Sequence, residues 1–173
     1  DKGTGFSFVQ CAHRVHFIVC GKDKRQQWMD FWGFKTCYAK DKYIPDKILK
    51  SPKSVIAAFI RGLFSADATV DKNDGRVIWA SCSKNMVDRI KCLLQSHFGI
   101  CSTIVSMDKG EYGIHYHLGL SCTRRKFWES INFTEGNPKK NILGKFLEVK
   151  GRVIYDRIYK IEDSECNVVD IEV

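Results

Sequence analysis

The chain has 173 residues, enough for one domain or a two-part unit with a sizeable core. Hydrophobic residues make up 44% of it and charged residues 28%, and no apolar run is long enough to predict a membrane span. The 28 Lys and Arg residues outnumber the 20 Asp and Glu residues, and the formal charge of +8 favours a polyanionic partner, nucleic acid first. The 8 cysteines include no CxxC pair, which argues against zinc and favours a reducing, intracellular compartment over a secreted disulfide scaffold.

The first elements are short. Apolar residues predict strands near residues 5–11 and 14–20 and then a helix over about 23–32. A second helix is expected over about 53–67, because apolar residues recur at positions 55, 56, 59, 60, 63 and 64 with helical spacing. Ser51 is predicted to be its N-cap, with Pro52 at the first helical position.

The elements after this helix alternate between strands and helices. A strand from Thr69 and a returning strand over 76–83 are joined by a turn, where Asp74-Gly75 suits a hairpin. An amphipathic helix is expected over 85–98, with Gly99 ending it. A second hairpin over 101–107 and 112–120 and a short helix over 123–130 follow. The inward residues of the amphipathic helix are predicted to be Met86, Ile90, Leu93 and Leu94.

The chain also repeats itself. Ile114–Leu118 lies 99 residues after the similar Val15–Val19, and the register holds through Phe133 against Phe34. After the loss of one residue, segment 140–147 aligns with segment 42–49, where four positions are identical: Lys42, Ile44, Lys47 and Leu49. We therefore expect a complete α-β-β-α-β-β-α unit over residues 50–149 and the C-terminal part of an equivalent unit over residues 1–49. The first helix of that earlier unit would lie upstream of Asp1, in a preceding segment or in a separate chain.

Ile60–Ala68 resembles the signature of the LAGLIDADG homing endonucleases. Gly62 stands at the packing glycine of that signature, Ala66 lies on the same helix face, and Asp67 stands at the catalytic, metal-binding acid. Two positions depart from the pattern, because Ser65 replaces the first acid and Ala68 the final glycine. The resemblance implies an α+β LAGLIDADG homing endonuclease fold, in which an αββαββα half-domain with antiparallel, saddle-shaped sheets is repeated with pseudo-twofold symmetry.

The resemblance also implies a chemistry. In that family two signature helices pack face to face, and each brings its terminal acid to metal ions that hydrolyse both DNA strands. Asp67 supplies one acid, so a second helix is needed from a preceding intein or endonuclease segment or a partner chain, with Mg²⁺ or another divalent metal as cofactor. Lys42 and Lys140 occupy equivalent repeat positions and resemble the basic residues beside the metals in intein-type members. The open alternative for both is a solvated lysine in a charge-rich loop.

Strand alternation predicts a DNA-binding face. Ile114, Tyr116 and Leu118 are expected to cover the helices, while His115 and His117 point to the other side. The resemblance implies that this open face lies in the major groove; a zinc site at the two histidines lacks further ligands. His16 is equivalent to His115, and cations at strand ends and hairpins suit phosphates or are ordinary surface charges: Arg14, Lys22, Lys24, Lys72, Arg76 and Lys109. Aromatic residues expected mostly in the core are Phe17, Trp28, Phe31, Trp79, Tyr116, Phe127 and Trp128.

Residues 150–173 fall outside the repeat. Val168–Val173 resembles the strand that opens the C-terminal splicing region of inteins, with Val169 in place of the usual Tyr; a plain β-hairpin is the alternative. The sequence as a whole predicts an intein-associated, site-specific double-strand DNA homing endonuclease. The alternative is a nucleic-acid-binding module of the same fold without nuclease activity, such as an intron RNA maturase or a DNA-binding regulator.

Overall fold

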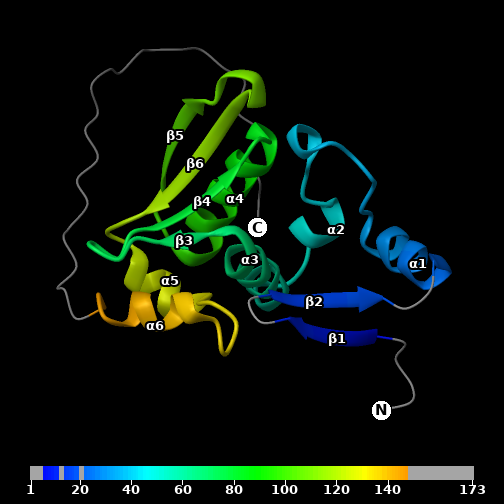
Figure 1. The fold of residues 1–173 in the computed structure, drawn as a ribbon, viewed down its shortest axis with the longest axis horizontal. Coiled ribbons are helices and arrows are strands. Elements are labelled where there is room, and N and C mark those ends of the chain that lie inside the picture. Colours follow the sequence, from blue (N-terminus) through cyan, green and yellow to red (C-terminus); the bar gives the residue numbers. More distant parts are fainter. Residues whose placement is uncertain (1–5, 12–13, 20–21, 148–173) are drawn as a thin grey trace, which may run out of the picture.

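The computed structural model describes residues 6–11, 14–19 and 22–147, and the side chains of residues 23–147 (Figure 1). The chain begins with an antiparallel hairpin of β1 (Phe6–Cys11) and β2 (Arg14–Val19). Helix α1 (Lys22–Trp32), a 3-10 turn η1 (Ala39–Asp41) and the short helix α2 (Asp46–Leu49) follow. The predicted order of two strands and a helix is confirmed, whereas η1 and α2 were not predicted. The predicted strands over 150–173 lie outside the described residues.

The second part of the chain is an α+β unit. Helix α3 (Lys53–Asp67) leads into β3 (Thr69–Val70) and β4 (Val77–Ser81), and α4 (Lys84–Phe98) leads into β5 (Thr103–Asp108) and β6 (Ile114–Leu120). The 3-10 turn η2 (Gly110–Tyr112) joins β5 to β6, and α5 (Arg124–Ser130) and α6 (Pro138–Gly144) follow. The strands form one antiparallel sheet in the order β3-β4-β6-β5. The predicted helices and hairpins are confirmed, although β3 is only two residues long and α6 was not predicted.

The two long helices begin differently. The hydroxyl of Ser83 accepts a hydrogen bond from the backbone N–H of Met86 at the start of α4, and Gly99 ends that helix in the left-handed region, with φ of 61°. Pro52, not Ser51, precedes the first residue of α3, so the predicted N-cap is wrong. The hydroxyl of Ser51 instead donates to the carbonyl oxygen of Lys47 at 2.6 Å, because the chain is still leaving α2 at that point.

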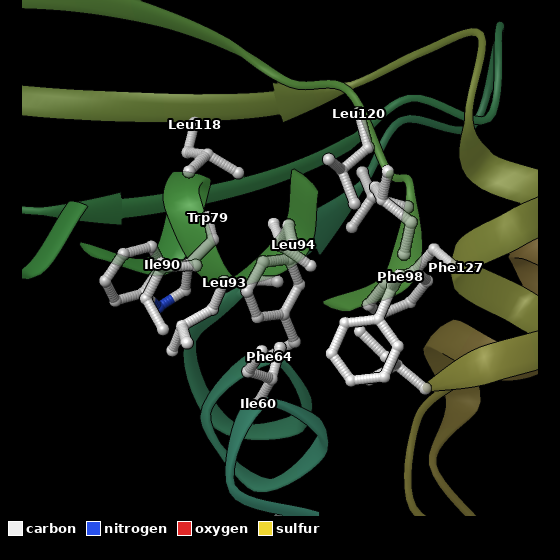
Figure 2. Packing of buried hydrophobic residues seen from close by; sticks show 14 of the residues in the cluster. Ile60, Phe64, Trp79, Ile90, Leu93, Leu94, Phe98, Leu118, Leu120 and Phe127 are labelled. Atoms are coloured by element: carbon white, nitrogen blue, oxygen red, sulfur yellow. The ribbon is translucent and has the colours of Figure 1, made fainter. Parts of the chain in front are cut away.

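The core lies between one face of the sheet and helices α3, α4 and α5 (Figure 2). Phe64 of α3 stands at its centre, with ring centroids 5.9 Å from Trp79 of β4 and 5.3 Å from Phe127 of α5. The predicted inward residues of α4 are buried, with exposed fractions of 0–6%. This packing fixes the direction of α3 beneath the sheet, and burial of large apolar side chains supplies most of the stability.

The end of the earlier unit belongs to the same core. Ile44 and Ile48 are each 4% exposed and belong to the hydrophobic cluster formed by the later unit. The hydroxyl of Ser83, which lies between β4 and α4 in the chain, donates to the carbonyl oxygen of Lys42 at 2.6 Å. Residues 42–48 are therefore packed onto the later unit.

The repeat is visible in an aromatic pair. Trp28 and Phe34 stack with ring centroids 5.5 Å apart, and the equivalent Phe127 and Phe133 lie 5.4 Å apart. Phe127 is fully buried under Phe64, whereas Trp28 is 38% exposed. Phe31 is 59% exposed, so the prediction that most aromatic residues are buried is wrong for α1. No helix in the described part of the chain is both long and apolar enough to cross a bilayer.

Candidate nucleic-acid interface and helix-end site

Helix α3 leaves one face uncovered. Ala58, Gly62 and Ala66 are exposed and recur every fourth residue, so they lie on one side of the helix. A Cβ atom built on Gly62 would meet no described atom within 4 Å. The opposite side, with Ile56, Ile60 and Phe64, is buried in the core. The predicted packing residues Gly62 and Ala66 are thus free to meet a second helix at close range.

Asp67 is the last residue of α3, and its side chain is exposed. A carboxylate at a helix C-terminus faces the negative end of the helix dipole and gains from a nearby cation. Lys139 of α6 supplies that cation: its Nζ donates to the carbonyl oxygens of Phe64 at 3.4 Å, Ser65 at 2.7 Å and Ala66 at 3.1 Å. Burial lowers the pKa of Lys139, and the charge of Asp67 acts in the opposite direction.

Ser65 is a structural residue in this arrangement. Its hydroxyl accepts a hydrogen bond from the backbone N–H of Thr134 at 2.9 Å, and its carbonyl oxygen also accepts one from Nδ2 of Asn137 at 3.0 Å. Three residues of segment 134–139, namely Thr134, Asn137 and Lys139, therefore donate hydrogen bonds to the last turn of α3. The position where the signature has its first acid serves here to anchor the helix end that carries Asp67.

Lys140 and Lys42, the two predicted catalytic lysines, do not make these contacts. The Nζ of Lys140 donates to the carboxylate of Glu135 at 2.6 Å and lies 5.9 Å from the ring centroid of Trp128. It lines a cavity of about 380 Å³ together with Arg61. Lys42 directly follows η1, and its side chain is exposed. Among the described residues, the lysine that contacts the α3 terminus is Lys139, which was not among the predicted site residues.

A sequence signal for this lysine does exist. Asn137 caps α6 by accepting from the backbone N–H of Lys139, and Pro138 stands at the first helical position. Successive residues of a helix point about 100° apart, so Lys139 and Lys140 must face different neighbours. The Asn-Pro pair predicts the helix, but the repeat alignment alone cannot tell which lysine faces α3.

The alternation predicted for β6 is largely present in the structure. Leu118 is fully buried and Tyr116 packs against the core, while His115 and His117 occupy the alternate positions of β6. Ile114 was expected to cover the helices but is 50% exposed, because the β5–β6 hairpin extends beyond the helical layer (Figure 1). Nε2 of His115 lies 3.3 Å from Sγ of Cys82, the residue that follows β4.

The predicted phosphate-binding cations are distributed around this sheet and α1. Lys72 and Lys109 are exposed in the two turns, and Lys24 is exposed on α1. Arg76 already pairs with Asp74 at 2.7 Å; its backbone N–H and then its guanidinium lower the pKa of that carboxyl. The side chains of Arg14, His16 and Lys22 lie outside the described ones. Their roles, like those of the lysines above, remain predictions.

Two comparisons concern the sequence. Residues 54–132 match the family model of the LAGLIDADG-like domain. A DNA polymerase of Thermococcus hydrothermalis is 29% identical over 162 residues, which is 93% of this chain and 9% of the polymerase. The chain thus spans a small part of this relative, and the matched domain covers α3 to α5.

Two solved structures resemble the fold. The crystal structure of I-DmoI in complex with DNA and Mn has a TM-score of 0.51 at 22% identity, with 73% of this chain and 62% of that chain covered. A structure of an I-DmoI variant with its target DNA in the presence of Mg also has a TM-score of 0.51, at 21% identity, covering 75% of this chain and 64% of that one. The α+β arrangement of this chain, with its antiparallel sheet and its helix ending in Asp67, is therefore the fold of the LAGLIDADG homing endonucleases.

Proposed function

We propose that this chain forms part of a site-specific double-strand DNA homing endonuclease. The observation that carries the proposal is the geometry of α3: an exposed small-residue face at Gly62 and Ala66 runs directly into an exposed carboxylate, Asp67. A second helix on this face would bring its own terminal acid beside Asp67. The likeness to proteins solved with DNA and with Mn or Mg supports the same reading.

The metal in this proposal is Mg²⁺ or another divalent ion. Among the described residues no group of three or more His, Cys, Asp or Glu side chains lies close enough together to hold an ion. Asp67 fits a divalent ion as one hard oxygen ligand, and the remaining ligands would come from the second helix, water and the DNA phosphate. When bound, such an ion would supply charge neutralisation at phosphorus and activation of a water. Lys42 and Lys140 are proposed to stabilise the developing charge, and Lys139 holds the helix end in place.

The exposure of Trp28 in α1 supports the need for a second helix. Phe127 is fully buried because Phe64 of α3 packs on it, whereas the equivalent Trp28 is 38% exposed. A helix equivalent to α3, supplied by a preceding intein or endonuclease segment or by a partner chain, would cover Trp28 in the same way. The likeness to a small part of a DNA polymerase supports a place inside a larger host protein, as an intein has. The cysteine usage supports a reducing intracellular compartment.

Cleavage of a supercoiled plasmid that carries the uninterrupted host sequence tests the proposal. The chain is produced together with a segment that carries a second signature helix, and Mg²⁺ is added. We expect cleavage of both strands, an at least 100-fold loss of rate in Asp67→Asn, and unchanged DNA affinity in that variant. Gly62→Leu should abolish cleavage by separating the helices. Gln95→Leu, on the exposed side of α4, is the control and should leave cleavage unchanged.

A second function is favoured by Ser65. The residue at the first acid position is committed to the backbone of Thr134, so a module that binds nucleic acid without cutting it is the alternative. Salt-sensitive binding that is unchanged in Asp67→Asn, with no cleavage under any metal, would support that module and contradict the nuclease.

A further inference from the structure

The open face of the sheet has a defined set of residues. Directly opposed residues of neighbouring antiparallel strands lie on the same face. The pairing of His117 with both Ala80 and Val105 places these three in one row, and His115 with Met107 forms the next row. The row on the other side holds Thr69, Ile78, Gly119 and Thr103. This set, which we name the open face, lies opposite the buried Trp79 and Leu118.

The composition of the open face is unusual for a surface that meets a polyanion. None of its nine positions holds Lys, Arg, Asp, Glu, Asn or Gln. Val105 is 58% exposed and Met107 40% exposed, and both lie on β5, the edge strand of the sheet. The described cations nearest to it stand at its edge, at Lys72, Arg76 and Lys109, and the side chain of Arg76, paired with Asp74, reaches over Gly119. Exposed apolar side chains on an edge strand favour aggregation unless they serve an interaction.

The missing residue types decide which bases this face can read. Guanine is read in the major groove by the paired donors of Arg or Lys, adenine by Asn or Gln, and cytosine by Asp or Glu. Apolar side chains instead contact the C5-methyl group of thymine. We propose that Val105 and Met107 are specificity-determining residues that select thymines in the major groove, and that the DNA beneath this sheet is rich in A·T pairs.

This inference rests on the proposed function, since it takes duplex DNA as the occupant of the open face. Charge supports that choice, because a cationic rim around a neutral centre matches phosphates on either side of a groove. A second copy of the chain would place the same rim cations against each other. His115 and His117 add imidazole groups beside the apolar side chains, and Cys82 holds His115 in place.

The test separates the inference from the function that it rests on. Duplexes are selected from a random library with the chain and its second-helix segment, and each thymine of a selected duplex is then replaced by deoxyuridine, which lacks only the methyl group. We expect one or two positions at which this replacement weakens binding about 4-fold, the effect of losing one buried methyl contact. In Val105→Ala or Met107→Ala the penalty at the corresponding position should disappear.

Ser106→Ala is the matched control, because Ser106 lies on β5 between the two residues but on its other face. This variant should keep the full deoxyuridine penalty. Selected duplexes without a thymine preference, or penalties that persist in both Val105→Ala and Met107→Ala, would overturn the inference while leaving DNA binding intact. Absence of binding even at low salt would instead contradict the proposed function. A concentration-dependent dimer that Val105→Ala abolishes would assign the open face to a second copy.

Discussion

The Nζ of Lys139 donates to the carbonyl oxygen of Ser65 across 2.7 Å, which ties α6 to the last turn of α3. The final carbonyl groups of a helix have no partner within the helix. A half-buried ammonium group that contacts three of them satisfies these acceptors and offsets the negative end of the helix dipole. The position of Asp67 therefore depends on a residue of another helix.

Lys139→Met should lower the free energy of unfolding by about 1–2 kcal/mol, because it leaves these carbonyl oxygens without a charged donor. Urea denaturation measures the change. Lys140→Met is the control: its partner Glu135 has a side chain that is 90% exposed, so the loss should stay below about 0.5 kcal/mol. Equal losses in the two variants would show that Lys139 does not stabilise the helix end.

The pKa of Asp74 predicts a dependence of stability on pH. Hydrogen bonds from Arg76 lower this pKa below its ordinary value of 3.8 in the folded state, so the carboxylate is stabilising above that value. The contribution is lost as the pH falls through the lowered folded pKa. Compared with Asp74→Asn, the native chain should be about 0.5 kcal/mol more stable near neutral pH, a small value because the pair is exposed to solvent.

Urea denaturation of both proteins at about pH 6 and about pH 2 provides the measurement for Asp74. The difference between the two proteins should shrink at the lower pH. A difference that grows on acidification would contradict the assigned direction of the pKa shift.

Gly75 is predicted to tolerate no side chain. Its φ is +69°, and a Cβ atom would lie 2.5 Å from the Cβ and Cγ of Phe146. Gly110 has a similar φ of +61° but open space around it, so Gly110→Ala reports the backbone strain alone. Gly75→Ala should cost about 1–3 kcal/mol more than Gly110→Ala because of overpacking. Thermal or urea unfolding of the two variants checks this, and equal costs would mean that Phe146 moves aside freely.

Ser83→Ala should also be costly. The hydroxyl of Ser83 is fully buried; it caps α4 and donates to the carbonyl oxygen of Lys42. Loss of both bonds should reduce stability by about 1–3 kcal/mol in urea denaturation. Ser96→Ala, which removes an exposed hydroxyl from the last turn of the same helix, should stay within about 0.5 kcal/mol. A similar result for both serines would argue against the cap.

The features that the sequence predicted correctly depend on residues close together in the chain. The 3.6-residue period predicted α3 and α4. Strand alternation predicted that His115 and Leu118 lie on opposite faces of β6, because both patterns depend on which face is buried. The repeat aligned Trp28 with Phe127 and Phe34 with Phe133. Both ring pairs are in contact, although the first pair is stacked and the second is edge-to-face.

What the pattern missed depends on contacts between distant segments. The exposure of Trp28 follows from the absence of a Phe64 equivalent over it among the described residues, which no property of Trp28 itself reveals. The choice between Lys139 and Lys140 depends on the rotation of α6 against α3. Ser51 has the residue type of an N-cap, but the tertiary path of the chain gives its hydroxyl another partner.

The packing of residues 42–48 has a consequence for protein engineering. A cut between Leu49 and Lys50 follows the repeat and looks like the natural place to separate the two units. It would remove Ile44 and Ile48, each only 4% exposed, from the later unit and strip Ser83 of its acceptor at Lys42. Chimeras that exchange half-domains should therefore be joined upstream of Lys42, in the exposed stretch 35–40, so that the recombined half keeps Ile44, Ile48 and the acceptor of Ser83.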